Sequence, residues 1–376
     1  MFRYHCRTAA AVAIAGLAAI LGSSSPPLHA RATLEVVATG LNNPRGLNFG
    51  PEGGLYVAEA GSGGAGPCVV IGGSPLPACY GQTGAVTRIT LGDPVAQERI
   101  LTGLPSFAVQ TGPTPGGSAT GPHDVEFQGR GNGFVTIGLG TDPARRDTDA
   151  TLKAVGDNFG RLIRFQPNGK WSFEEDLAAF EGDKNPDGGA HDSNPYGLLA
   201  QPGRQVFTDA GGNALNAVDA NGSISNLAVF PNRTVGTATF QAVPTTVTQG
   251  PDGQLYVGQL TGFPFLAGAA NVYRVPAAGG TPEIYASGFT KIIDIAFAED
   301  GSLYVLQISS TGGAPPQGGT GSLYRVPLGG GAPTTIVAPG AGLVAPGGIA
   351  IDRDGTIYVT NFSVSPGTGT VVRVVP

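Results

Sequence analysis

Residues 294–305 read DIAFAEDGSLYV, which is a short apolar strand, an Asp-Gly turn, and a second apolar strand ending in Tyr-Val. Apolar runs on either side of a Gly-containing turn are typical of a β-hairpin. The phrase recurs at 348–359 (GIAIDRDGTIYV), 246–257 (TVTQGPDGQLYV) and 46–57 (GLNFGPEGGLYV), and more weakly at 124–135 (DVEFQGRGNGFV) and 197–207 (GLLAQPGRQVF). The sequence therefore predicts six copies of one structural unit.

Each copy continues into two further strands. The third strand carries an apolar-x-Arg-apolar pattern in most units, as in 323–326 (LYRV), and a fourth follows, as in 283–286 (EIYA). Four antiparallel strands repeated six times predict an all-β fold, a six-bladed β-propeller. The last copy ends after its third strand, and residues 35–40 (EVVATG) resemble the fourth strand at 283–288 (EIYASG). We therefore expect the N-terminal strand to complete the last blade and close the ring.

The amino-acid composition agrees with this interpretation. The 62 Gly and 31 Pro among 376 residues disfavour helices, and only 13% of residues are charged. A disordered chain is excluded because 41% of residues are hydrophobic and the chain holds 17 Phe and 10 Tyr. An open solenoid of β-units is the structural alternative, but it would need capping repeats, and the sequence offers none.

The N-terminus has the pattern of a signal peptide. Arg3 and Arg7 precede an apolar run at 8–21, and a small-residue segment follows with Ala30-Arg31-Ala32 at its end. The run is shorter than the roughly 20 residues that span a bilayer. We expect cleavage after Ala30 or Ala32, which makes residues 1–32 a leader and 33–376 a single secreted or periplasmic domain.

The charge of the mature chain restricts its partners. Residues 1–32 contain three arginines and no acid, so their removal takes the formal net charge from −6 to −9. An acidic chain without a basic cluster is not suited to nucleic acid or to an anionic membrane surface. We expect a monomer that binds neither.

Two cysteines remain in the mature chain. Cys68 and Cys79 lie in a stretch rich in Gly and Pro, and an even pair in an exported protein predicts a disulfide. A two-cysteine metal site is the alternative, but no further Cys or His lies nearby in the sequence.

Four long insertions indicate where a functional face would lie. They fall in the loops after second strands and between blades, which share one end of a propeller, and they cover 60–84, 102–122, 138–159 and 174–195. Loops of this length in a compact domain are usually functional. A short helix is predicted over 174–180 within the last insertion.

Polar residues at the starts of the innermost strands should point at the channel mouth. The candidates for binding are Asn43, Arg45, His123, Asp124, Asn194, Tyr196, Lys291 and Asp294. A second set at the ends of the second strands comprises Glu59, Asp209, Gln259, Gln307 and Asn361. Such oxygens can bind a divalent cation such as Ca²⁺, or they can cap turns. Turn capping is the interpretation favoured for the second set, and both stay open for the first.

His123 is the candidate catalytic base, with Arg45 to hold an anionic group. Adjacent strand residues point to opposite sides, so His123 and Asp124 should not pair with each other. A structural hydrogen bond at the channel mouth is an equally good interpretation of His123.

Asp183, Asn185 and Asp187 match the opening of a calcium loop, D-x-N-x-D-G. Asn194 stands where the full loop needs a bidentate Glu, and Pro186 interrupts the motif. A polar turn is therefore the favoured interpretation, with a weak metal site as the alternative.

Several stretches resemble the secreted propellers of the ScyD/ScyE family. They are 41–47 (LNNPRGL), 56–61 (YVAEAG), 121–125 (GPHDV), 185–189 (NPDGG), 192–198 (DSNPYGL) and 258–265 (GQLTGFPF). The resemblance covers the mature chain and implies an exported, NHL-like six-bladed propeller. The family name derives from genes near those for the pigment scytonemin, and it implies no reaction and no catalytic residue. A looser likeness of fold connects such chains to quinone-dependent sugar dehydrogenases and metal-dependent lactonases.

Two functions follow as expectations. The first is an extracytoplasmic propeller that binds a small molecule, glycan or protein on its loop-rich face. The second is an enzyme at the channel mouth, either a metal-dependent hydrolase or a quinone-dependent oxidoreductase. The lack of a nucleophile elbow, an H-E-x-x-H motif or a phosphate-binding loop in the sequence favours the first.

Overall fold

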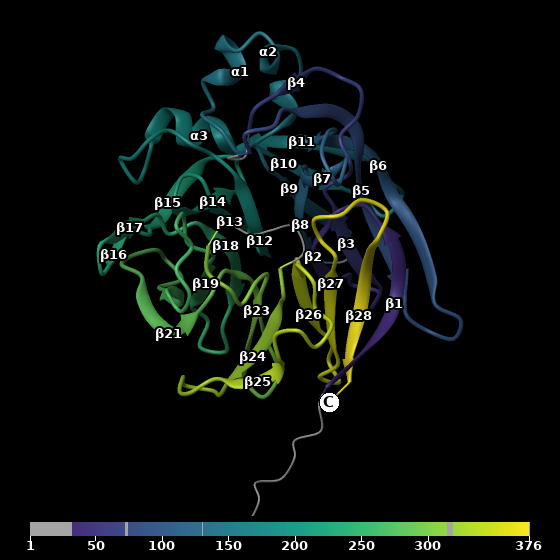
Figure 1. Cartoon of the computed structure of the whole chain (residues 1–376), viewed down its shortest axis with the longest axis vertical. Helices are drawn as coiled ribbons and strands as arrows, with labels where there is room; N and C mark the ends of the chain where they lie inside the picture. The colour runs from purple at the N-terminus through teal and green to yellow at the C-terminus, as the bar shows by residue number, and fades with distance from the viewer. Residues whose placement is uncertain (1–31, 72–73, 130, 314–318, 376) are drawn as a thin grey trace, which may run out of the picture. The chain divides into compact units, whose positions relative to one another are not determined.

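The computed structural model describes residues 32–71, 74–129, 131–313 and 319–375. The predicted leader, except Ala32, lies outside the described residues. The described chain folds into antiparallel sheets arranged around a common centre, with one innermost strand from each sheet facing that centre (Figure 1). The all-β, six-bladed β-propeller predicted from the repeats is confirmed.

The first three blades follow the chain in order. The first sheet is β2 (Pro44–Phe49), β3 (Leu55–Glu59), β5 (Ala78–Thr90), β6 (Ala96–Val109) and β7 (Gly117–Thr120), with β4 (Cys68–Val69) beside β5. The second is β8 (Pro122–Gln128), β9 (Asn132–Ile137), β10 (Arg161–Phe165) and β11 (Trp171–Asp176). The third is β12 (Pro195–Gln201), β13 (Arg204–Asp209), β14 (Ala214–Asp219) and β15 (Ile224–Val229).

The remaining blades repeat the pattern after a small hairpin of β16 (Arg233–Val235) and β17 (Ala238–Phe240). The fourth sheet is β18 (Pro244–Gln249), β19 (Leu255–Gln259), β20 (Ala270–Val275) and β21 (Glu283–Phe289). The fifth is β22 (Ile292–Phe297), β23 (Leu303–Gln307), β24 (Ser322–Val326) and β25 (Thr334–Val337).

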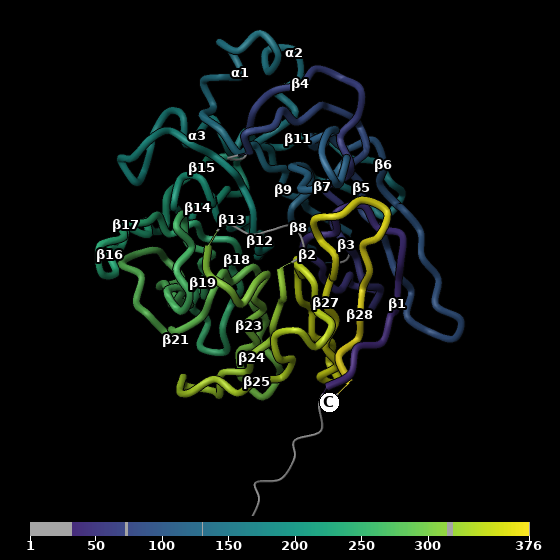
Figure 2. Tube along the Cα trace, viewed as in Figure 1, coloured from purple at the N-terminus to yellow at the C-terminus, as the bar shows by residue number. Residues whose placement is uncertain are grey.

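The sixth blade joins the two ends of the chain. It consists of β26 (Gly348–Ile351), β27 (Ile357–Asn361), β28 (Gly369–Val375) and β1 (Thr33–Leu41). β1 pairs antiparallel with β28, from Thr33 opposite Val375 to Leu41 opposite Gly369, and the two run side by side at the start and end of the colour range in Figure 2. The predicted closure is therefore correct, and it leaves no free sheet edge at this junction.

Helices are short and lie in the insertions. They are α1 (Arg145–Thr148), α2 (Leu152–Val155), a 3-10 turn at Gly156–Asn158, and α3 (Leu177–Lys184). No helix among the described residues is long and apolar enough to cross a bilayer. α3 begins three residues after the start of the predicted helix, because the Asp176 carboxylate accepts a hydrogen bond from the Ala179 N–H and caps it there.

The insertions contact one another. Arg145 donates a hydrogen bond to the Val70 carbonyl at 3.0 Å, which joins the insertion after β9 to that after β3. Thr141 and Ser193 form an isolated β-bridge between the insertions of the second and third blades. Gly63 N–H donates to the Ser106 hydroxyl at 3.0 Å, which joins the two insertions of the first blade.

Candidate functional site

Three adjacent blades place a large polar side chain at the same position of their innermost strands. β2, β8 and β12 each begin with proline, and the next residue is Arg45, His123 or Tyr196. The three side chains lie close together, since the His123 and Tyr196 rings are in contact and the charge of Arg45 acts on both. These three residues are named the channel triad.

Arg45 is a buried cation with few partners. Its side chain is only 8% exposed, and Nη2 donates to the Ala119 carbonyl at 2.8 Å. Nε is buried without a hydrogen-bond partner in the described part of the chain. Arg45 takes part in none of the salt bridges found among the described residues. A buried guanidinium with unused donors is costly unless something else satisfies it.

His123 is held neutral by its surroundings. It is 3% exposed, and its Nδ1–H donates to the Pro195 carbonyl at 3.0 Å, which leaves Nε2 as the acceptor nitrogen. Burial and the charge of Arg45 lower the pKa of His123 to about 3. As expected from strand geometry, His123 and Asp124 do not pair, since the Asp124 oxygens bond elsewhere.

Tyr196 completes the channel triad. Its ring lies 4.3 Å from the His123 ring, centroid to centroid, at an angle of 30°. Burial raises the pKa of Tyr196; the charge of Arg45 and its interaction with the Tyr196 hydroxyl act against that rise, and the charges of Asp294 and Asp124 add to it. Its neighbour Asn194 accepts a hydrogen bond from the Leu139 N–H at 3.2 Å. The phenol therefore stays protonated and lies within electrostatic reach of both the cation and the channel acids.

Asp124 and Asp294 tie innermost strands together. Asp124 accepts from the Leu198 N–H at 2.8 Å, so β8 is held to β12. Asp294 accepts from the Ile349 N–H at 2.8 Å and from the Thr246 hydroxyl at 2.6 Å, which joins β22 to both neighbours. Burial raises the pKa of Asp124 well above its ordinary range and that of Asp294 to about 6.

Glu126 is a further channel acid, and it was not among the candidates from the sequence. It lies two residues after Asp124 on β8, and burial raises its pKa to about 8 although Asn48 donates a hydrogen bond to it. Alternation along a strand puts residues i and i+2 on one side, so the pattern Asp124-x-Glu126 was a usable signal. A channel cavity of about 210 Å³ is lined by all three acids, Asp124, Glu126 and Asp294. Its other lining residues run along the innermost strands away from the channel triad.

Two of the predicted binding residues donate their hydrogen bonds to loop carbonyls. The Asn43 side chain is fully buried and donates to the carbonyls of Gly61 at 2.7 Å and Gly116 at 2.8 Å. Lys291 is 2% exposed, donates to the Gly313 carbonyl at 2.6 Å, and lies 5.3 Å from the centre of the Phe265 ring. Burial lowers the pKa of Lys291. These contacts are with loops, and none joins either residue to the channel triad.

The predicted calcium motif forms a polar turn. Asp183 is exposed in the last turn of α3, and Asn185 ends that helix with a left-handed φ of 42°. The Gly188 N–H bonds to the Asn185 carbonyl, and the Asp187 carboxylate accepts from the Gly189 N–H. No group of three or more His, Cys, Asp or Glu side chains within the described ranges is arranged to hold a metal ion as it stands.

The predicted disulfide is present. Cys68 and Cys79 are bonded, and they face each other across the β4–β5 pair. The bond closes a loop in the first long insertion, outside the four-strand repeat.

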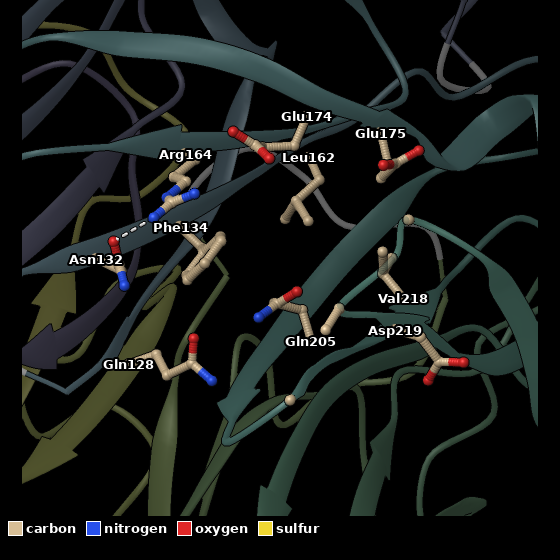
Figure 3. Close-up of a pocket in the computed structure, with 13 residues that line it drawn as sticks. Gln128, Asn132, Phe134, Leu162, Arg164, Glu174, Glu175, Gln205, Val218 and Asp219 are labelled. Carbon is tan, nitrogen blue, oxygen red and sulfur yellow. Dashed lines mark hydrogen bonds between the residues drawn. The ribbon is translucent and has the colours of Figure 1, made fainter.

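A separate polar pocket of about 290 Å³ lies between the second and third blades (Figure 3). Gln128 and Gln205 line it, together with Glu174 and Glu175, and Arg164 donates to Asn132 at 2.7 Å on one wall. No pattern in the sequence indicated this pocket, because its lining residues come from six different strands and from turns.

Known proteins support the fold and no further detail. No protein-family model matches this chain, and no curated protein matches it in sequence. A protein of unknown function from Bacteroides thetaiotaomicron is similar in structure, with a TM-score of 0.53 and 9% identity over 92% of this chain and 76% of that one. A protein described as a gluconolactonase has a TM-score of 0.51 and 12% identity over 92% of this chain and 93% of its own. A streptogramin B lyase has a TM-score of 0.50 and 12% identity over 91% of this chain and 98% of its own. At these identities the likeness shows the β-propeller architecture alone.

Proposed function

We propose that this chain is an exported propeller of the ScyD/ScyE type that binds a small carboxylate-bearing molecule, with Arg45 as the anchor. The observation that carries the proposal is the buried Arg45 guanidinium, whose Nε has no partner among the described residues and which forms no described salt bridge. A carboxylate is the anion whose two oxygens best match a guanidinium.

The neighbours of Arg45 suit binding. His123 offers a neutral acceptor nitrogen and Tyr196 a protonated hydroxyl, so the channel triad presents one cation and two neutral polar groups. A free sugar acid or another small hydroxy acid has matching groups. A glycan or protein that ends in a carboxylate would use the same anchor.

Export is part of the proposal. The signal-like N-terminus and the Cys68–Cys79 bond both suit an oxidising compartment outside the cytoplasm. The acidic mature chain suits neither nucleic acid nor an anionic membrane, and we propose that it acts as a monomer.

Binding is favoured over catalysis by the state of His123. An effective general base has a pKa near the working pH, whereas burial holds the pKa of His123 at about 3. Such a nitrogen accepts a hydrogen bond but is a weak base. The channel-mouth enzyme predicts that His123→Ala abolishes turnover at unchanged thermal stability, and retained turnover would remove His123 from that role.

The test compares a carboxylate with its neutral amide. Glucuronate and glucuronamide are titrated into the disulfide-bonded mature protein by calorimetry at constant ionic strength. We expect binding of glucuronate only, and Arg45→Gln should weaken it about 10- to 100-fold, since a charge-assisted hydrogen bond contributes about 1.5–3 kcal/mol.

The matched control is Arg164→Gln. Arg164 is exposed and donates to Asn132 on the edge of a different pocket. Its replacement should leave glucuronate binding unchanged. Equal loss in both variants, or equal binding of acid and amide, would contradict an anchor at Arg45.

A further inference from the structure

The loop after α3 contains buried oxygens that nothing in the fold explains. The segment called here the loop 181–192 includes the last turn of α3, and it packs against the end of β13 and the β13–β14 turn, where Asp209 and Gly212 lie. Four buried side-chain oxygens in the loop lack a hydrogen-bond partner within the described residues: both carboxylate oxygens of Glu181, Oδ1 of Asn185 and Oδ1 of Asp192. Buried polar atoms are nearly always satisfied, so four in one loop need a cause.

Glu181 is the most demanding of these groups. It is 1% exposed on the last turns of α3, and its carboxylate lies against Gly212. A Cβ added to Gly212 would come within 2.6 Å of Glu181 Oε2 and 3.4 Å of the Asp209 carboxyl carbon. The glycine therefore makes room for the carboxylate, which points toward Asp209 and away from solvent.

Asn185 at the C-terminal cap of α3 and Asp192 at the end of the loop each have one free side-chain oxygen. Asn185 donates its amide N–H to the Gly189 carbonyl at 2.9 Å, which leaves Oδ1 as the unused atom. Asp192 lies beside Gly211, since a Cβ there would be 2.8 Å from the Asp192 carbonyl oxygen. Asp192 is thereby placed next to the turn that Glu181 faces.

Negative charge accumulates at this point. The carboxylates of Asp209, Asp187 and Asp192 lie close enough to act electrostatically on Glu181, and those of Asp209 and Asp142 act on Asp192. A cation at this point would offset the repulsion among these carboxylates.

We propose that the loop 181–192 is a Ca²⁺ site in which Glu181, Asn185, Asp187 and Asp192 supply the side-chain oxygens. Asp209 is a positioning residue, because its carboxylate already accepts from the Asn194, Gly211 and Gly212 N–H groups and from the Ser193 hydroxyl. The four side chains offer up to seven carboxylate and amide oxygens, of which the two of Asp187 also accept hydrogen bonds from the Gly189 N–H and the Asn213 side-chain amide. No three acidic side chains of the described residues already surround one point, so calcium binding would require side chains of the loop to rotate.

The donor set selects the kind of cation. All the ligands are hard oxygens, and His191, the histidine within the loop, is exposed. Ca²⁺ takes six to eight such oxygens in flexible geometry, including a bidentate carboxylate and an amide, whereas Zn²⁺ prefers N and S ligands and Mg²⁺ keeps most of its water. Asp183, the first residue of the sequence motif, is exposed and takes no part.

The test uses the oxidised mature protein with CaCl₂ or MgCl₂ at matched ionic strength after EDTA treatment. We expect native mass spectrometry to show one bound calcium, and calorimetry to give a Kd between about 1 μM and 1 mM. CaCl₂ should raise Tm and MgCl₂ should raise it far less. No calcium uptake at about 5 mM CaCl₂ would overturn the proposal.

Two variants separate the site from general charge effects. Glu181→Gln should lose the calcium response while its metal-free Tm stays equal to or above that of the wild type, because a buried carboxylate is removed. Asp183→Asn, two residues away and exposed, should keep the full response. Equal responses in both variants would overturn the proposal. An unfolded Glu181→Gln protein would also overturn it, since the fold would then need that carboxylate without metal.

Discussion

Burial decides the chemistry of single residues in this propeller. His123 lies beside a cation in a nearly closed site, and both features disfavour its protonated form. Glu126 and Asp294 are shifted by the same burial in the direction of their neutral forms. At neutral pH the channel therefore holds less charge than its residue types suggest, and the Arg45 cation stands out.

The low pKa of His123 predicts acid sensitivity. Its pKa is about 3 when folded and about 6.5 when unfolded, so the unfolded chain binds the extra proton as pH falls through that window. Stability from this residue is present above pH 6.5 and is lost toward pH 3. The free energy of unfolding can be measured with urea at each pH. Between pH 6.5 and 4.5 we expect it to fall by about 1–3 kcal/mol less in His123→Asn than in the wild type.

His191→Asn provides the control for that prediction. His191 is exposed, so its replacement should leave the pH slope as in the wild type. The buried acids act in the opposite direction, because their raised pKa values favour the fold at low pH, but they are common to all three proteins and cancel. Parallel slopes for His123→Asn and the wild type would show that His123 does not cause the acid loss.

At the scale of elements, polar residues at equivalent positions of several blades make the same kind of hydrogen bond. Residues at the ends of second strands accept hydrogen bonds from the backbone just before the innermost strands, as Glu59 does from Asn42, Asp209 from Asn194 and Gln307 from Thr290, each at 2.7 Å. Asn361 does the same from Val344, so four of the five residues cap turns as expected. Gln259 differs, because its Oε1 accepts from the Asn271 N–H and its Nε2 donates to the Ala242 carbonyl. Turn capping also explains why so many polar residues near the channel are not ligand groups.

The innermost strands approach one another closely enough to require glycine. A Cβ on Gly197 of β12 would lie 2.6 Å from Thr246 Cα and 2.8 Å from the Thr245 carbonyl oxygen of β18, and both are backbone atoms. We expect Gly197→Ala to cost about 2–4 kcal/mol in chemical denaturation, since neither strand can move without its neighbours.

Gly131→Ala is the control, because a Cβ there meets nothing within 4 Å. It should change stability by less than about 0.5 kcal/mol. A Gly197→Ala protein as stable as Gly131→Ala would mean that the inner strands separate more easily than this packing implies.

For the whole molecule, closure depends on nine residues at the start of the described chain. β1 covers the edge of β28 and places Leu41 and Ala38 in a buried cluster with Leu47 and Val371. Leu41 is fully buried. The ring is therefore held by a strand from one end of the sequence and a hairpin from the other.

Deleting residues 33–41 tests this closure. Loss of buried Leu41 alone should cost about 2–5 kcal/mol, and the exposed edge of β28 should promote association. We expect a lower Tm and larger species by light scattering. A synthetic peptide of residues 33–41 should restore Tm, and one with Leu41 and Ala38 replaced by Ser should not. An unchanged Tm in the deleted chain would refute closure by β1.

The sequence by itself determined the repeat, the number of blades, the closing strand and the disulfide. These follow from local patterns such as the Asp-Gly turns and the 35–40 match to 283–288, which report strand and turn preferences directly. The start of α3 was displaced because the Asp176 cap, a single side-chain contact, decides where that helix begins.

Only the tertiary structure decided which polar residues are free. Asn43 and Lys291 looked like channel ligands, yet backbone carbonyls from distant loops use them. Arg45 was already a candidate from the sequence, and Glu181 was not; the structure singles out both because their surroundings leave buried atoms unsatisfied. Satisfaction of a polar group depends on which carbonyls and N–H groups the folded chain brings within about 3 Å, and long-range contacts of that kind leave no local pattern in the sequence.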